Sequence, residues 1–316
     1  MIADLAIQGA QMALVLLLAP LLTGFVRKVK ARLTRRRGAS VLQPYRDLLR
    51  LLRKDVVMAE NASWLFGAVP YLVFASTWVA AALVPTFGTN LMFSWSADLI
   101  AIVALLGSGR FFLALAGMDV GTSFGGIGSS REAMIATLAE PAMLMIVFTL
   151  ALVAGSTQLS TVADHMLHSD VGLRVSLGLA LIALVMVAIA ENGRIPIDNP
   201  ATHLELTMVH EAMVLEYSGR HLALIEAAAS LKLLLYLSLI ACVFTPWGMT
   251  RPGETVVPLL IGAGAFVGKL AIGGFLLALF ETAIAKMRVF RVPDFLGAAL
   301  MLGLLGTLLL FVSQRW

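Results

Sequence analysis

Charged residues are scarce in this chain. Asp, Glu, Lys and Arg make up 13% of its 316 residues and 59% are hydrophobic, whereas about a quarter of a typical soluble domain is charged. This balance excludes a soluble fold. A membrane-spanning helix needs about 20 apolar residues, and the sequence predicts about eight of them in one all-α, polytopic transmembrane domain covering residues 1–316. The expected spans are 5–26, 64–84, 99–117, 133–155, 175–190, 222–245, 256–280 and 295–312.

A basic leader of the kind found in signal peptides is also missing. Asp4 stands in the first residues, and the apolar run that follows is longer than a signal peptide needs and lacks a small-residue cleavage pattern. We therefore expect the first span to remain in the protein.

Cysteine is almost absent. Cys242 is the single cysteine and lies in an apolar span, so the chain closes no disulfide within itself and cannot ligate an iron–sulfur cluster, which needs several cysteines. His165 and His168 share an outer loop, but nearby carboxylates lack the spacing of a metal site. We expect no metal site, no bound cofactor and no catalytic residue in this chain.

Basic residues concentrate in alternate loops. Of 23 Lys and Arg, 17 lie in four loops, and three lie in the other loops or at the C-terminus. Because cytoplasmic loops of membrane proteins carry an excess of Lys and Arg, these four loops should face the cytoplasm, and both termini should lie outside. The four expected cytoplasmic loops are 27–63, 118–131, 191–220 and 281–294.

The first of these loops contains an amphipathic segment, LQPYRDLLRLLRK. Tyr45, Leu48 and Leu52 fall on one side of a helix, and Arg46 and Arg50 fall on the other. This pattern predicts a cytoplasmic helix at the membrane interface. Such a helix could lie on the lipid, or it could brace an entrance or a partner at the membrane surface.

Several ionisable side chains lie within the expected spans or at their cytoplasmic ends. They are Arg110, Glu140, Glu191, Glu226, Lys232, Lys269 and Glu281. Because buried charges are expensive in a bilayer, they mark functional sites by default, and the outer halves of the spans contain almost none. This asymmetry indicates a polar cavity that opens to the cytoplasm, ends near the midplane and passes protons or a conformational signal sideways to another subunit. The alternative is that the charges are ion pairs that serve packing alone.

The third cytoplasmic loop is unusually rich in carboxylates. If it is helical after Asn199 and Pro200, then Glu205 and Glu216 are eleven residues apart, almost three whole turns, and point the same way. Such a row of carboxylates could share protons. The alternative is a solvated loop.

Matching broken helices and internal repeats are missing as well, which counts against a transporter built from inverted repeats. The glycine-rich segment GMDVGTSFGGIGSSRE follows a membrane helix and lacks the lysine of a phosphate-binding loop, so nucleotide binding there is not expected. Gly264 and Gly268 form a small-residue pair that favours close helix packing.

Three segments stand in order along the chain: PLLTGFVRKVKARLTRRRG with LQPYRDLLRLLRK, then SREAMIATLAEP around Glu140, then AENGRIPIDNP running to LEYSG. Together they resemble the subunit 1 family of respiratory complex I and its relatives in membrane-bound hydrogenases. The resemblance covers essentially the whole chain. It implies an eight-helix subunit that docks a soluble electron-transfer arm and links it to antiporter-like membrane subunits that pump protons or sodium ions.

Two departures favour one branch of that family. Val26 stands where complex I members usually have Glu, and His203 stands at a usually acidic position. With the SFGGIGSSRE segment, these features resemble the formate hydrogenlyase subunit 4 and hydrogenase-4 component C branch. That branch implies hydrogenase large and small iron–sulfur subunits as partners, which would hold the nickel–iron and iron–sulfur centres, and requires no quinone.

The resemblance also implies roles for individual residues. It places a polar path at Glu140, Glu191, Arg194, Asp198, Glu205 and Glu216. The intramembrane charges add Arg110, Glu226, Lys232, Lys269 and Glu281 as candidates for the same path. Docking of the soluble arm is expected at Arg27, Lys28, Arg35, Arg36, Arg37, Tyr45, Arg46, Asp47, Arg131 and Glu132.

Two other functions stay open at this point. One is the quinone-chamber subunit of an NADH:quinone oxidoreductase, and the other is a free-standing ion transporter. We expect a place in a bacterial or archaeal cytoplasmic (inner) membrane, with the lipid bilayer and protein subunits as partners and no nucleic acid.

Overall fold

Long apolar helices dominate the structure. The computed structural model describes residues 2–89, 93–168, 175–198, 208–250 and 256–313, and these residues contain helices and no strand. Seven of the helices are long and apolar enough to cross a membrane. They are α1 (Ile2–Leu33), α3 (Trp64–Leu83), α4 (Leu99–Asp119), α5 (Ser123–Ala154), α9 (Gly219–Phe244), α10 (Val256–Ala283) and α11 (Val292–Ser313).

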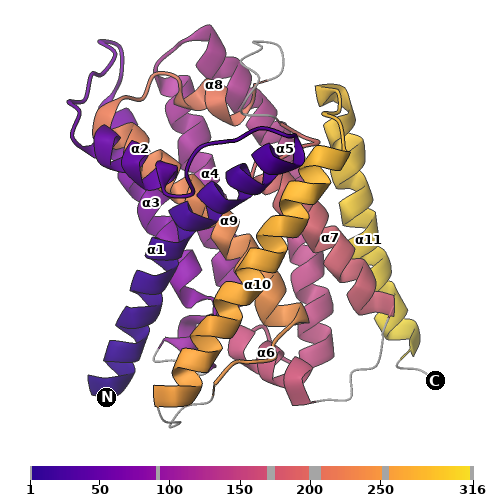
Figure 1. The fold of residues 1–316 in the computed structure, drawn as a ribbon. Coiled ribbons are helices and arrows are strands. Elements are labelled where there is room, and N and C mark those ends of the chain that lie inside the picture. The colour runs from indigo at the N-terminus through magenta and orange to yellow at the C-terminus, as the bar shows by residue number, and fades with distance from the viewer. Residues whose placement is uncertain (1, 90–92, 169–174, 199–207, 251–255, 314–316) are drawn as a thin grey trace.

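An eighth apolar helix, α7 (Val175–Glu191), has 17 residues and runs beside the seven long ones (Figure 1). The expectation of an all-α, polytopic membrane protein is confirmed.

In the described part of the chain, three short helices and two 3-10 turns connect the long helices of this bundle. Helices α2 (Gln43–Leu52) and α8 (His210–Val214) lie at one end, which we call the basic end, and helix α6 (Leu159–His168) lies at the other, the terminal end (Figure 1). Single 3-10 turns cover Ser94–Ser96 and Val289–Arg291. The start of α1 and the end of α11 both lie at the terminal end (Figure 1), as expected for an even number of spans.

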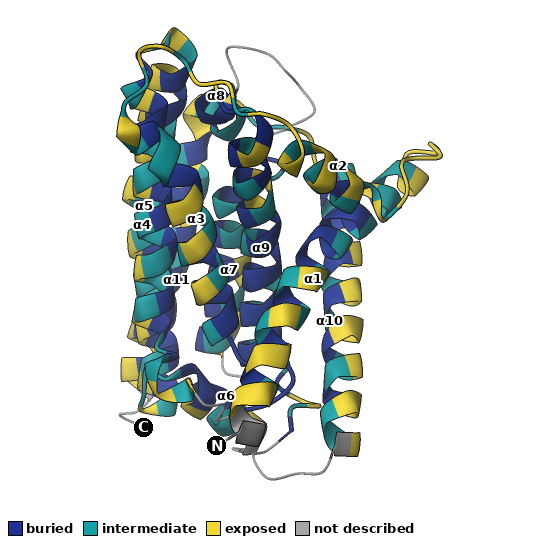
Figure 2. Ribbon diagram, turned by 90° about the vertical axis from the view of Figure 1, so that its left-hand side faces the viewer, coloured by how far each residue is buried: buried dark blue, intermediate teal, exposed yellow. Residues whose placement is uncertain are grey.

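Helix α9 occupies the centre of the bundle. It packs against α3, α1, α2 and α10, whereas α5, α7 and α11 pack on one another along a neighbouring side. Two thirds of its most apolar window (67%) is buried, against 22% for α10, which is mostly exposed on the flank of the bundle (Figure 2). Side chains projecting from α9 can therefore reach several other helices, while α10 borders the lipid or a partner.

The amphipathic helix expected in the first loop is α2. Pro44 lies buried in its first turn, and the helix packs against α9 and α1. Its outward side keeps Leu49 and Leu52 more than half exposed. The helix thus braces the bundle on one side and presents leucines at the interface on the other.

Most of the expected loop 118–131 is helical, because α5 begins at Ser123. The Thr122 side chain caps the helix by accepting a hydrogen bond from the Gly125 backbone nitrogen. A side chain on Gly125 would collide with the Gly117 carbonyl, and one on Gly128 would approach Met213 Cγ to 2.9 Å. The glycines therefore allow close packing against α4 and α8.

The other expected cytoplasmic loops are also shorter than their sequence bounds. Helix α1 continues to Leu33 and α10 to Ala283. In the third loop, α8 ends at Val214, so Glu216 lies beyond it and does not extend a helix from Asn199. Glu205, His203 and the rest of 199–207 lie outside the described residues.

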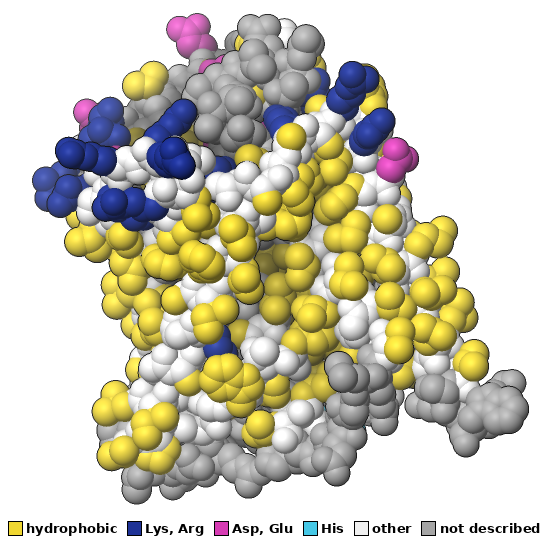
Figure 3. Space-filling model, turned by 45° about the vertical axis from the view of Figure 1, so that its right-hand side comes forward, with side chains coloured by type: hydrophobic (Ala, Val, Ile, Leu, Met, Phe, Trp, Pro, Cys, Tyr) yellow, Lys and Arg dark blue, Asp and Glu magenta, His cyan; other side chains and the backbone are white. Residues whose placement is uncertain are grey.

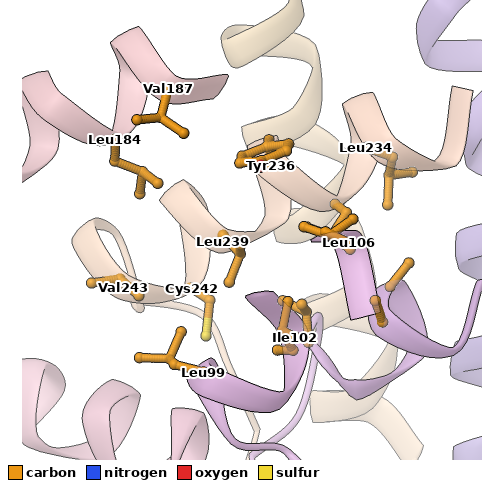
Figure 4. Packing of buried hydrophobic residues seen from close by; sticks show 14 of the residues in the cluster. Leu99, Ile102, Leu106, Leu184, Val187, Leu234, Tyr236, Leu239, Cys242 and Val243 are labelled. Carbon is orange, nitrogen blue, oxygen red and sulfur yellow. The ribbon is translucent and has the colours of Figure 1, made fainter. Parts of the chain in front are cut away.

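An apolar core fills the terminal half of the bundle. Leu99 begins α4 and Val243 nearly ends α9 at the terminal end, and between them Ile102, Leu239 and Cys242 point toward one another (Figure 4). These side chains are at most 2% exposed. We call Leu99, Ile102, Leu184, Leu239, Cys242 and Val243 the apolar layer.

Candidate functional site

A group of five charged side chains lies between α4, α5, α7 and α9. At its centre Arg110, only 4% exposed, places Nε 3.0 Å from Glu132 Oε1 and pairs through Nη2 with Glu191. Lys232 Nζ lies 2.8 Å from Glu191 Oε2. Glu140 is held most loosely, with Oε1 3.9 Å from Arg110 Nη1. We call Arg110, Glu132, Glu140, Glu191 and Lys232 the polar cluster.

Helix geometry brings these residues together. Glu132 and Glu140 are eight residues apart on α5, slightly more than two turns, so both face α4. On α4, Gly107 leaves room for Glu140: a side chain there would begin 3.4 Å from Glu140 Oε1. Helix α5 has 32 residues, about 48 Å, so its first turns extend past a hydrocarbon core of about 30 Å.

A cavity connects the polar cluster with the basic end. It has a volume of about 90 Å³ and is lined by Arg110, Glu132, Glu191 and Lys232 together with Asp198 and His210. A water molecule needs roughly 10–15 Å³ measured in this way, so the cavity has room for several. A second cavity of about 10 Å³, lined by Glu140, Glu191 and Tyr236, has room for about one water. Glu191 lines both cavities, so water-sized spaces lie beside the polar cluster both on the Asp198 side and on the Glu140 side.

Glu140 differs from the rest of the polar cluster in its exposure. Its side chain is 44% exposed, whereas Arg110 is 4% and Glu191 is 6% exposed. A charged group facing lipid is costly, so this flank of the bundle is suited to contact with another protein. Glu140 thus has the most exposed side chain of the polar cluster.

The turn after α7, residues 192–198, holds a second set of charges, and we call it the cap turn. Gly193 adopts φ +53°, and the Arg194 backbone nitrogen donates to the Ile189 carbonyl at 3.0 Å, which closes the helix in the manner of a Schellman motif. Asp198 accepts from Lys286 Nζ at 3.0 Å and from the Val209 backbone nitrogen at 3.2 Å. These contacts tie the cap turn to the α10–α11 connection.

Arg194 points from the cap turn toward Glu281 at the end of α10, with Nη1 3.4 Å from Oε1. Burial lowers the pKa of Arg194, while the charge of Glu281 opposes that shift. The other oxygen of Glu281 contacts Lys30 Nζ at 3.0 Å. Of the expected relay residues, Asp198 therefore lines the cavity at the polar cluster, and Arg194 and Glu281 pair with each other next to the cap turn.

The structure separates three other expected relay residues from the polar cluster. Glu216 and Glu226 are exposed. Lys269 Nζ donates to the carbonyls of Thr245 at 2.6 Å and Trp247 at 2.5 Å, beyond the terminal end of α9. A lysine side chain is long enough to reach polar groups near the membrane surface, and Lys269 reaches those at the terminal end of the bundle.

The expected docking residues also divide. Arg27, Arg35, Arg36, Arg37 and Arg46 are exposed at the basic end, where Lys and Arg gather (Figure 3). Tyr45, by contrast, donates its hydroxyl to the Leu17 carbonyl, and burial raises its pKa.

Lys28 Nζ donates to the Arg37 carbonyl at 2.8 Å, and Asp47 accepts from Gln43 and Arg50. Arg131 donates to the Met208 carbonyl at 2.7 Å. Glu132 lies inside the polar cluster instead of on a docking surface.

Sequence reasoning missed several partners. Lys30 and Lys286 pair with buried carboxylates. Both lie in sequence segments expected to be basic loops, where no local pattern separates them from solvated neighbours. Gln8 and Gln11 were missed too: their amides donate to carbonyls at the end of α3, so the terminal half holds buried polar, uncharged side chains.

Comparison with known proteins identifies the family to which the chain belongs. A sequence model of the family described as NADH dehydrogenase matches residues 7–312. The chain belongs to this family. Because the match spans nearly the whole chain, the resemblance expected from the three sequence segments is confirmed.

Individual relatives of this NADH dehydrogenase family chain point to membrane complexes. Formate hydrogenlyase subunit 4 of Escherichia coli (strain K12) is 36% identical over 275 residues, covering 87% of this chain and 88% of the relative. Hydrogenase-4 component C of the same organism is 36% identical, covering 77% and 76%. NADH-ubiquinone oxidoreductase chain 1 of Triticum aestivum is 28% identical, covering 66% of each chain.

A solved structure of the membrane-bound sulfane sulfur reductase, an archaeal respiratory membrane complex, contains a chain with the same fold. The TM-score is 0.79 at 20% identity, covering 95% of this chain and 98% of that one.

Proposed function

We propose that this chain is the membrane subunit of a complex I-like hydrogenase in a bacterial or archaeal cytoplasmic membrane. In this role the basic end faces the cytoplasm and anchors a soluble module with hydrogenase large and small subunits. The polar cluster passes protons, or the associated conformational signal, to antiporter-like membrane subunits. The redox centres belong to the partners. The two relatives at 36% identity carry the hydrogenase assignment.

One observation carries the coupling role: a charged, cavity-lined path that begins at the basic end and stops at Glu140 on the flank. Two cations, Arg110 and Lys232, face three carboxylates in the polar cluster. Ionised Glu132 and Glu191 balance these cations, so Glu140, the most loosely held, can gain a proton without leaving a cation unpaired. Its exposed side chain can then exchange that proton with a neighbouring subunit.

The apolar layer supports a sideways exit over a direct one. Below Tyr236 the side chains of Ile102, Leu239 and Cys242 are at most 1% exposed and carry no charge, and continuous ion paths need polar groups along their length. Protons that reach Glu140 therefore have a polar route back to the basic end and out through the flank, but not through this layer.

The test uses the intact complex in inverted membrane vesicles, driven by hydrogen with benzyl viologen as electron acceptor. Glu140→Gln keeps the size of the side chain and removes its proton exchange, so we expect hydrogen oxidation to continue while proton translocation is lost. Glu60→Gln, at an exposed carboxylate of the basic end, is the matched control. Full proton translocation by the Glu140 variant would contradict its role in the relay. Ion conduction by the isolated chain in liposomes would instead favour a free-standing transporter.

A further inference from the structure

Glu281 joins two cations that come from distant parts of the chain. Its side chain is 2% exposed, and its two oxygens are divided between Lys30 of α1, at 3.0 Å, and Arg194 of the cap turn, at 3.4 Å. One carboxylate at the end of α10 thus connects α1 with the turn that follows α7.

The Lys30 side of this contact leads to the docking region. Helix α1 ends at Leu33, three residues after Lys30, and runs directly into the exposed arginines 35–37. Lys28 Nζ donates to the carbonyls of Arg37 and Gly38, at 2.8 and 3.4 Å, which folds this basic arm back onto the helix. A partner that binds the arm therefore acts on the same helical turn that carries Lys30.

The Arg194 side leads to the polar cluster. The Arg194 backbone nitrogen is hydrogen-bonded to the Ile189 carbonyl, and its carbonyl accepts from Ile197 at 2.8 Å, so the residue is fixed to the last turn of α7. Glu191 ends that helix and pairs with Arg110 and Lys232. Contacts through Glu281, Arg194 and one hydrogen-bonded turn therefore connect Lys30 with Glu191.

We propose that Lys30, Glu281 and Arg194 form a bridge that transmits movement of the docking arm to Glu191. The inference rests on the proposed function, and it makes Lys30 a positioning residue that acts on the relay through Glu281. The buried carboxylate suits this purpose, because removing either partner of a buried ion pair leaves an uncompensated charge. Separating either cation from Glu281 is therefore unfavourable, which links the position of α1 to that of the cap turn.

The experiment compares single and double variants of the whole complex in the hydrogen-driven vesicle assay. Lys30→Gln and Arg194→Gln should each lower the protons translocated per hydrogen oxidised roughly fivefold or more, the lower end of ordinary coupling factors, while hydrogen oxidation and the yield of assembled complex are kept. Lys30→Arg should restore the ratio. Arg32→Gln, at an exposed arginine of the same helix end, should leave it unchanged.

The double variant Lys30→Gln with Glu281→Gln separates a bridge from independent effects. If the residues act in series, the double variant is no worse than Glu281→Gln alone. The bridge would be overturned if Lys30→Gln kept the wild-type number of protons translocated per hydrogen oxidised, or if the losses multiplied in the double variant. It would also be overturned if the yield of complex and the rate of hydrogen oxidation fell as much as this number.

A second measurement does not depend on pumping. Amide hydrogen exchange of residues 192–198 is compared in the membrane complex before and after the soluble module is stripped. The wild type should lose protection in the cap turn, and Lys30→Gln should show the stripped level throughout. No change in the wild type overturns the bridge. A wild-type complex that moves no protons overturns the proposed function instead, and the exchange result still decides the bridge.

Discussion

The two halves of the bundle solve the problem of burial in opposite ways. Toward the basic end, Arg110 and its partners bring five charges into the protein and surround them with cavities of about 90 and 10 Å³. Toward the terminal end, the apolar layer closes the same helices with side chains at most 2% exposed. Helices α4, α7 and α9 contribute to both halves, so the boundary falls within single helices, near Leu106 and Tyr236.

This comparison shows that one helix can carry charge for part of its length and exclude it for the rest. A charge at the bilayer centre costs about 2.5–3.5 kcal/mol on insertion scales, and the polar cluster meets that cost by pairing. In the apolar layer no such partner is present among the described side chains.

Arg110→Gln should have the largest effect on stability. It removes the cation that contacts three carboxylates. Removing one partner of a buried ion pair lowers the free energy of unfolding by about 3–5 kcal/mol. Thermal unfolding of the purified protein in detergent measures the loss. Arg220→Gln, at an exposed arginine in the first turn of α9, is the control, and equal midpoints for the two variants would contradict a central role for Arg110.

Two polar substitutions one turn apart on α4 should locate the boundary. Leu106 lines both cavities, so Leu106→Asn can find polar partners there, whereas Ile102 is fully buried in the apolar layer. We expect Ile102→Asn to be less stable than Leu106→Asn by about 1–3 kcal/mol, the usual cost of a buried, unsatisfied polar group. Equal unfolding midpoints would mean that the polar region extends below Leu106.

Lys269→Gln should have the smallest effect. Lys269 donates to carbonyls beyond the end of α9, and a cation at a helix C-terminus contributes roughly 0.3–1 kcal/mol. A small fall in the unfolding midpoint with an unchanged ratio of protons to hydrogen is expected. Lys232→Gln is the matched comparison, since it removes a partner of Glu191 and should lower that ratio. A coupling defect in the Lys269 variant would show that the relay reaches the outer half.

Hydropathy was sufficient to predict the fold class and the approximate spans, because long apolar runs can be satisfied only by helices in a bilayer. It misplaced the start of α5, since the glycines and serines from Ser123 to Ser130 read as a loop until their packing against α4 and α8 is known. The same misplacement assigned Glu132 to the docking surface. Ten more residues of helix put it beside Arg110.

The sequence was better at predicting which residues belong to the candidate site than at predicting which partners they contact. Arg110, Glu140 and Lys232 stood out because charge within an apolar run is rare. Lys269 stood out for the same reason, yet depth along a helix does not reveal which surface a long side chain reaches. Lys30 could not be chosen among the basic residues of its loop, because its partner lies 251 residues away in sequence.

The arrangement of the polar cluster along the chain bears on how the protein is made. Arg110 and Glu132 stand on consecutive helices, so they can enter the membrane together as an ion pair. Glu191 and Lys232 follow on α7 and α9 and form a second neutral pair. Within the polar cluster, Glu132 and Glu191 are thus each matched with a basic residue, and Glu140 is the third carboxylate, which suits its proposed contact with another polypeptide.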